Sequence, residues 1–444
     1  MADPVVFTRR AFMERGVALV SAGATVPLFL DRTAWAMADP LDVKLVKSVP
    51  GIPDDRILVV VQLAGGNDGL NTVVPYRNDR YYEARPRLGI GKDEGLKIDD
   101  DLALHPSAVG LKQLYDDGLL GIVQGVGYPN PNRSHFVSTD IWSSATPGQS
   151  IRDGWIGRYF DCTCSGKDRP DPKLGIALTR ESPLAMAGRR FSPVSFESPN
   201  ELSWRSPKSK GIAQKTFHAL NSNPDNRAAP SESPTNSKSA LAYLQRVAMD
   251  AMTGAREIQD AAGTGGGGRP GRRGGQRQPG NRGRSQLSRQ LDMVKRMIAS
   301  GLETRVYYVS QGGFDTHAGQ SGRHANLLRQ FSDALAGFVN DLKRDGLLDK
   351  VVVMTFSEFG RRVVENASGG TDHGAAAPLF IAGSRIKPGV HSSHPSLEPD
   401  KLDRGDLAWN TDFRSVYSGI LSGWLKADAA KILGGDFGGL KLIR

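Results

Sequence analysis

Cysteine is almost absent from this chain, which has 2 cysteines in 444 residues. They are Cys162 and Cys164, and the single residue between them strains an ordinary disulfide. A zinc site built from cysteine alone needs more thiolates than the chain has. The scarcity therefore excludes a disulfide framework and a cysteine-only metal site, and it leaves the redox compartment open.

Several common catalytic signatures are also missing. The stretch "GGNDG", residues 65–69, lacks the Lys-Ser/Thr pair of a phosphate-binding loop and the spacing of a dinucleotide fingerprint. No serine is framed by a G-x-S-x-G elbow. These absences disfavour P-loop nucleotide hydrolases, dinucleotide-dependent oxidoreductases and elbow-type serine hydrolases.

The net charge of +10 is concentrated in one segment rather than spread over a nucleic-acid-binding face. Residues 263–286, "GTGGGGRPGRRGGQRQPGNRGRSQ", hold six arginines and no acidic residue, so the rest of the chain carries +4. Ten of these residues are glycine, and such a composition predicts a disordered loop. Because no aromatic residue is interleaved for base stacking, a solvated loop is favoured over an RNA-binding tail.

The N-terminus has the pattern of an export signal. Arg9 and Arg10 precede Phe12, an apolar run of fifteen residues follows, and "AMA" at 36–38 offers small residues at a cleavage spacing. The run is too short to span a membrane. The pattern resembles a twin-arginine signal. We therefore expect residues 1–38 to be removed and the mature chain to lie in the periplasm, on the cell surface or outside the cell.

The mature chain alternates apolar strands with helices. Continuous apolar runs predict buried strands at 56–64, 121–127, 173–179, 304–311, 350–356 and 378–383. Apolar residues at steps of three and four predict a helix over 323–346. The alternation predicts an α/β fold with a mostly parallel sheet covered on both faces. We expect one such domain over 39–444, with a polar helical insertion at about 200–262 before the Arg/Gly loop.

Polar clusters lie at the ends of several of these strands, where ligands bind in parallel sheets. They comprise three aspartates, one glutamate, three histidines and one serine: Asp68, Ser134, His135, Asp315, His317, Glu358, Asp372 and His373. Alone, "DTH" or "TDHG" is more often a capped turn than a pair of metal ligands. Together, carboxylates crowded at one edge raise one another's pKa unless a cation lies among them. Mixed Asp/His ligation suits zinc, manganese or iron.

Seven stretches resemble a bacterial exported family, domain of unknown function 1501: "TRRAFM", "LVVVQLAGGNDGLNTVVP", "RSHF", "GGFDTH", "TFSEFGRR", "GGTDHG" and "NTDFRSVY". That family in turn resembles the alkaline phosphatase and sulfatase superfamily. This implies a three-layer αβα sandwich with metals at the strand ends. By the resemblance Asp68 corresponds to the first-strand aspartate, Asp315 with His317 to the middle metal ligands, Asp372 with His373 to the late ones, and Ser134 to the nucleophile.

One stretch departs from the superfamily pattern. Where the superfamily has Ser-Asp-His-Gly, this chain has Ser357-Glu358-Phe359-Gly360, and phenylalanine cannot bind a metal. The second metal site is therefore incomplete or remodelled, with His135 as a candidate replacement. The Cys/Ser-x-Pro-x-Arg activation motif is absent as well, which disfavours formylglycine-based sulfatase chemistry.

From these residues we expect an exported metal-dependent hydrolase of phosphate or sulfate esters. Its predicted metal ligands are Asp68, Asp315, His317, Glu358, Asp372 and His373. Its predicted catalytic residues are Ser134, His135 and Arg361, with Arg361 or Arg362 steadying the anion. Zinc is the expected ion, with manganese, iron and calcium as alternatives. The expected partner is an anionic small or polymeric ester and not nucleic acid.

The alternative is a non-catalytic, metal-stabilised surface protein that binds an anionic glycan or protein partner. Loss of the Asp-His pair at Glu358-Phe359 favours that alternative, and the oligomeric state is left open.

Overall fold

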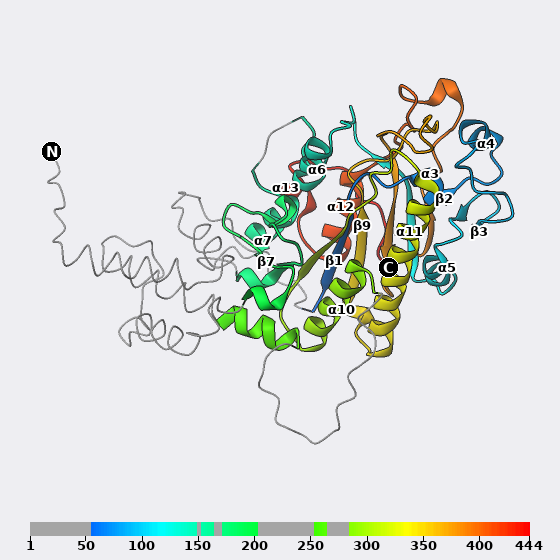
Figure 1. The fold of residues 1–444 in the computed structure, drawn as a ribbon. Helices are drawn as coiled ribbons and strands as arrows, with labels where there is room; N and C mark the ends of the chain where they lie inside the picture. The colour runs from blue at the N-terminus through cyan, green and yellow to red at the C-terminus, as the bar shows by residue number, and fades with distance from the viewer. Residues whose placement is uncertain (1–54, 149–151, 164–170, 203–252, 264–283) are drawn as a thin grey trace, which may run out of the picture.

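A computed structural model describes residues 55–148, 152–163, 171–202, 253–263 and 284–444 (Figure 1). The expected export signal at 1–38 lies outside the described residues. So do most of the expected insertion and most of the Arg/Gly loop. Within the insertion, residues 253–261 form a helix.

The described chain folds around one large sheet and a small second one. The large sheet has the order β11-β5-β10-β9-β1-β8-β6-β7, and β12 also pairs with β5. Its strands are β1 (Ile57–Leu63), β5 (Leu120–Gly127), β6 (Gly175–Ala177), β7 (Val194–Ser195), β8 (Val306–Gln311), β9 (Val351–Phe356), β10 (Ala377–Ala382), β11 (Gly389–His391) and β12 (Thr411–Asp412). The small sheet pairs β2 (Val73–Val74), β4 (Ala103–Leu104) and β3 (Leu96–Lys97).

Within the large sheet β10 alone runs antiparallel to its neighbours. It pairs antiparallel with both β5 and β9, whereas every other pairing in this sheet is parallel. The mixed, mostly parallel sheet confirms the fold class expected from the sequence.

Helices cover both faces of the large sheet, which gives three layers (Figure 1). On β1, Val59 and Val61 belong to one core cluster, and Leu58 and Val60 belong to the other. The first cluster includes side chains of α5 (Val109–Asp116), α10 (Gln286–Ala299) and α11 (Gln320–Arg344). The second includes side chains of α6 (His135–Ser144), α7 (Trp155–Thr163), α12 (Phe413–Gly419) and α13 (Ala429–Leu433). Since successive strand residues point to opposite faces, continuous apolar strands are what two covered faces require.

The sequence of helix α11 explains why this segment is helical. Its buried residues include Leu328, Phe331, Leu335 and Leu342, whose steps of three, four and seven form one apolar stripe. Burial of each such side chain stabilises the fold by about 1.5–3 kcal/mol. The helix starts after Gly319, whose φ is 52°, and it ends in basic residues that complement its dipole. The predicted helix over 323–346 is thereby confirmed.

The topology brings the polar loops to one edge of the sheet. Strands β1, β5, β8 and β9 run parallel to one another, so the loops after them leave at the same edge. Because β10 is antiparallel, the loop that precedes it starts from that edge too. Four sequence-distant loops therefore meet there, since the loop after β9 is also the loop before β10. Among the described residues, no helix is both long and apolar enough to cross a membrane.

Candidate metal centre

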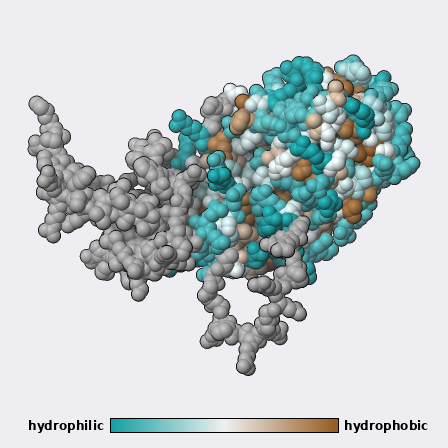
Figure 2. All heavy atoms as spheres, viewed as in Figure 1, coloured by the Kyte–Doolittle hydropathy of each residue, from teal (hydrophilic) through white to brown (hydrophobic). Residues whose placement is uncertain are grey.

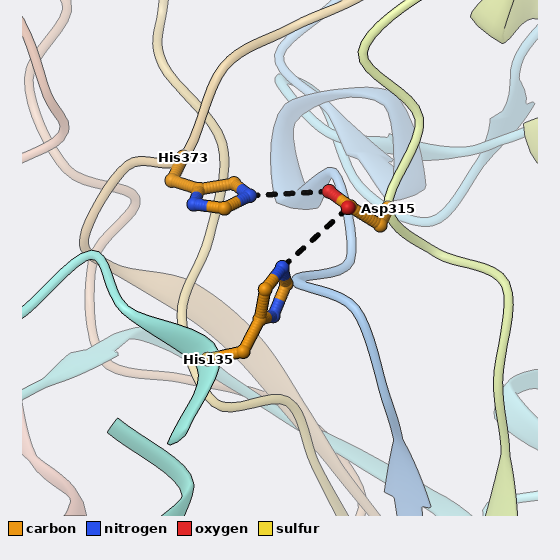
Figure 3. A group of neighbouring side chains, drawn as sticks. All are labelled: His135, Asp315 and His373. Carbon is orange, nitrogen blue, oxygen red and sulfur yellow. Dashed lines mark hydrogen bonds and ion pairs between the residues drawn. The ribbon is translucent and has the colours of Figure 1, made fainter. Parts of the chain in front are cut away.

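His135, Asp315 and His373 form a group at this edge with potential ligand atoms all within 4.8 Å of one another. His135 is the first residue of α6, Asp315 follows β8, and His373 precedes β10. The Nε2 atom of His373 lies 3.1 Å from one carboxylate oxygen of Asp315. The Nε2 atom of His135 lies 3.5 Å from the other oxygen. The three side chains point toward one another (Figure 3).

Each imidazole of the group is anchored through its other ring nitrogen. The Nδ1 atom of His135 lies 2.8 Å from a carboxylate oxygen of Glu358. The Nδ1 atom of His373 lies 2.8 Å from the backbone carbonyl oxygen of Arg133. Because a carbonyl oxygen only accepts, the proton of neutral His373 lies on Nδ1 and its Nε2 lone pair faces Asp315. Metal-binding histidines are oriented by such carboxylate and carbonyl partners.

His317 adds a fourth side chain that could bind a metal ion beside the group. Its Nδ1 atom lies 3.0 Å from the carboxylate of Asp372, and its Nε2 atom lies 2.9 Å from His373 Nε2 and 3.0 Å from Asp315. Hydrogen bonding from His317 is the main reason that the pKa of Asp372 lies below its usual value. Three imidazole nitrogens thus converge on one carboxylate while their Nδ1 atoms face acceptors. A divalent cation fits such a donor set, because it replaces repulsion among lone pairs with ligation.

Asp315 is held ionised by its neighbours. Partial burial raises its pKa, but the hydrogen bond and the positive charge of Arg361 contribute to a net lowering of the pKa to about 2. The Nη2 group of Arg361 donates to the carboxylate at 2.7 Å. A carboxylate that stays ionised at neutral pH suits a metal ligand.

Phe359 forms an apolar wall of the site. Its ring is buried, and its centroid lies 4.9 Å from that of His135 and 4.6 Å from that of His373. The residue that departs from the superfamily pattern therefore packs against two histidines of the group.

The family model described as "Protein of unknown function (DUF1501)" matches residues 120–405, more than half of the sequence. The chain belongs to the DUF1501 family. The matched range contains His135, Asp315 and His373, and it confirms the family resemblance seen in the sequence. No curated protein matches the chain.

Solved structures similar to this DUF1501 protein include members of the alkaline phosphatase superfamily. One is alkaline phosphatase from the Antarctic bacterium TAB5, with 10% identity, 75% of this chain and 92% of that chain covered, and a TM-score of 0.32. Another is a superfamily protein from Vibrio parahaemolyticus, with 10% identity, 93% and 78% covered, and a TM-score of 0.37. A third is the C-terminal periplasmic domain of EcEptC from Escherichia coli, with 12% identity, 77% of each chain covered, and a TM-score of 0.30.

Arg361 occupies a different position from the one expected of an anion-binding residue in this DUF1501 chain. Its side chain is fully buried, and it donates to four backbone carbonyls and to Asp315. Those carbonyls belong to three loops of the site: Gly65 and Gly66 after β1, Phe314 after β8, and Thr371 before β10. Arg361 therefore positions Asp315 by tying these loops together, and the expectation that it steadies a substrate is corrected.

Asp68 is likewise engaged away from the group. Its carboxylate and the guanidinium of Arg85 form an ion pair at 2.5 Å, and both side chains are fully buried. Gln320 donates to the same oxygen at 2.5 Å, and the N–H of Asn71 donates to the other at 3.4 Å. Burial raises the pKa of Asp68, but Arg85 and the other partners lower it below its usual value. The structure does not bring this expected ligand into the group, because the carboxylate is already satisfied.

Glu358 and Asp372 contact the group through histidines. Glu358 is buried and accepts from the N–H of Gly65 as well as facing His135. Asp372 faces His317 and accepts from Asn366. Both residues were expected to be metal ligands. In the structure each faces the Nδ1 atom of a histidine instead, which is the position of a carboxylate that orients a metal-binding histidine.

Ser134 is the N-cap residue of α6 and is exposed. Its backbone N–H donates to Asn132 at 2.8 Å, and its hydroxyl does not cap the helix. It directly precedes His135 in the chain, and its role as the nucleophile stays a prediction.

Two residues that the sequence did not single out organise the site. Arg133 supplies the carbonyl that orients His373, and its guanidinium donates to Asp406 at 2.5 Å. Gln320 accepts from the hydroxyls of Thr316 and Thr371 while it donates to Asp68. Arg133 stands in the stretch "RSHF", in which only the serine and the histidine were singled out, and Gln320 directly follows "GGFDTHAG", so both had a visible signal.

The loop after β1 and the loop after β8 approach each other closely at Gly65, where only glycine fits. Gly65 has φ +117°, and a Cβ atom there would lie 2.5 Å from the backbone nitrogen of Asp315. Only glycine fits this position without moving the loop that carries Asp315.

Proposed function

We propose that this DUF1501 protein is an exported metal-dependent hydrolase of phosphate or sulfate esters. One observation carries the proposal. The Nε2 atoms of His135, His317 and His373 converge on the carboxylate of Asp315, while each Nδ1 atom faces a carboxylate or a carbonyl. The twin-arginine pattern at residues 8–13 supports export.

His135, Asp315 and His373 would hold the ion, with His317 beside them. Glu358 and Asp372 orient two of the histidines, and Arg361 holds Asp315. A bound divalent ion supplies Lewis-acid polarisation of an ester oxygen and lowers the pKa of water or of a nearby hydroxyl. The donor set of nitrogen and oxygen atoms favours zinc, manganese or iron over calcium.

Ser134 or a water molecule is the nucleophile in this proposal. The Ser134 hydroxyl is exposed at the N-terminus of α6, directly before His135. A helix N-terminus favours negative charge, which develops on the attacking and transferred groups.

Two arginines at the rim take the anion-steadying role in place of Arg361. Arg133 and Arg362 both donate to the buried carboxylate of Asp406, and their side chains are 39% and 37% exposed. Arg133 follows β5 and Arg362 follows β9, so both come from loops that leave the sheet at the edge of the metal group. Two guanidiniums share the single carboxylate of Asp406, so each keeps a donor for an anionic ester.

The test is an assay of the zinc-loaded full chain with an aryl phosphate, a phosphodiester and an aryl sulfate. We expect turnover of at least one ester, abolished in Asp315→Ala and reduced at least about a hundredfold in Ser134→Ala if serine attacks. His391→Ala is the control, because its Nε2 atom bonds only to the carbonyl of Lys387 among the described residues. Metal binding without turnover of any ester would refute the hydrolase and leave the metal-stabilised binding protein.

A further inference from the structure

Few large apolar side chains are exposed on the described part of the chain. There are four: Val109, Phe136, Val137 and Val364. The surface seen in Figure 2 is mostly hydrophilic, with hydrophobic residues scattered singly. Three of the four exposed residues are neighbours of the site in sequence. Phe136 and Val137 directly follow His135, and Val364 comes two residues after Arg362.

Phe136 and Val137 have no part in the core that α6 packs against. The helix buries Ser138, Ile141 and Trp142 on its inner face. By contrast, the side chain of Phe136 is 85% exposed and that of Val137 is 44% exposed. Single exposed apolar residues are normal on proteins. A phenylalanine that is almost fully exposed beside a metal-site histidine has no folding role to explain it.

The position of Phe136 relative to the metal group follows from helix geometry. Successive helical residues are turned by about 100°, so Phe136 projects beside His135 rather than over it. His135 faces Asp315, whereas Phe136 faces solvent at the rim. The first turn of α6 therefore presents an apolar surface to solvent directly beside the metal group.

Two arginines at the same rim could contact the anionic part of an ester. Arg133 lies two residues before His135, and Arg362 bonds to the same carboxylate of Asp406. In the contacts of the described residues the Nη1 groups of both arginines have no acceptor. The rim thus combines free cationic donors with an apolar surface, which matches an anion joined to an apolar group.

We propose that Phe136 and Val137 bind the apolar alcohol or phenol part of the ester, so that the substrate is amphiphilic. This inference rests on the proposed function, because it places the ester at the metal group. Arg133 and Arg362 would contact the anionic part.

The experiment measures equilibrium binding, so it does not depend on turnover. Phenylphosphonate and methylphosphonate, which carry no hydrolysable ester, are titrated calorimetrically into the zinc-loaded full chain. We expect phenylphosphonate to bind about tenfold more tightly, because the ring buries apolar area on Phe136. Phe136→Ser should remove this preference, and Phe136→Leu should keep part of it.

Val109→Ser is the matched control, because Val109 is 61% exposed on α5, a helix of the opposite layer. It should retain the full preference. Zinc content and the unfolding midpoint should be unchanged in all three variants. An unchanged preference in Phe136→Ser would overturn the inference. Self-association of the native chain that Phe136→Ser abolishes would also overturn it, by assigning the surface to a second copy. Failure of the hydrolase proposal appears separately, as absence of ester turnover in the native protein.

Discussion

Replacement of Arg361 by methionine tests whether this residue holds the site together or contacts the substrate. Methionine fills a similar volume but donates no hydrogen bond. Four backbone carbonyls, those of Gly65, Gly66, Phe314 and Thr371, lose their guanidinium donor in this variant. At about 1 kcal/mol for each acceptor left unsatisfied in a buried environment, the free energy of unfolding falls by about 4 kcal/mol. That is a large fraction of the roughly 5–15 kcal/mol that stabilises a typical domain.

The assay is urea denaturation of the zinc-free chain, so that loss of metal does not contribute. Arg361→Lys should also be destabilised, because one ammonium cannot reach carbonyls in three loops. Arg362→Met is the control: its guanidinium is 37% exposed and its bond to Asp406 is 3.3 Å long, so a loss below about 1 kcal/mol is expected. If Arg361→Met changed stability no more than Arg362→Met while raising the KM for an ester, the positioning role would be refuted.

Three further predictions concern residues around the group. Glu358→Gln should weaken zinc binding about 10- to 100-fold in a competition titration, since Glu358 orients His135, and unchanged affinity would contradict this role. Gly65→Ala should destabilise the fold and weaken zinc binding, because its Cβ would lie 2.5 Å from Asp315, and a native-like melting curve with native affinity would count against the close approach. Burial lowers the pKa of His324 from 6.5 to about 4, so the unfolded chain binds a proton that the folded chain does not, and stability falls as the pH drops from about 6.5 to 4. His324→Gln should remove about 3 kcal/mol of that pH dependence, and an unchanged pH profile of urea unfolding would refute its origin in His324.

The main features of the fold were predictable because they follow from local pattern. The buried parallel strands are continuous apolar runs in the sequence, and the apolar residues of α11 recur at helical spacing. The antiparallel direction of β10 was not predictable from its sequence "APLFIA", which fits either direction. That direction brings the loop with His373 to the edge where the other loops meet.

The site was predictable as a set of loops but not in the roles of its residues. Strand-end position brought together His135, Asp315, His317 and His373, as expected. It did not show that Asp68 is neutralised by Arg85, which lies 17 residues away in a loop without a motif. A carboxylate looks alike in sequence whether it faces a metal or an arginine, since only packing decides its partner.

The central claim is that His135, Asp315 and His373 bind one divalent ion. The most direct measurement is the metal content of the full chain after dialysis against zinc, beside His135→Ala, Asp315→Ala, His373→Ala and the control His391→Ala. We predict about one zinc per native chain, the same content in His391→Ala, and a loss of at least about tenfold in affinity in the other three. Native zinc content in all three site variants would contradict the metal centre.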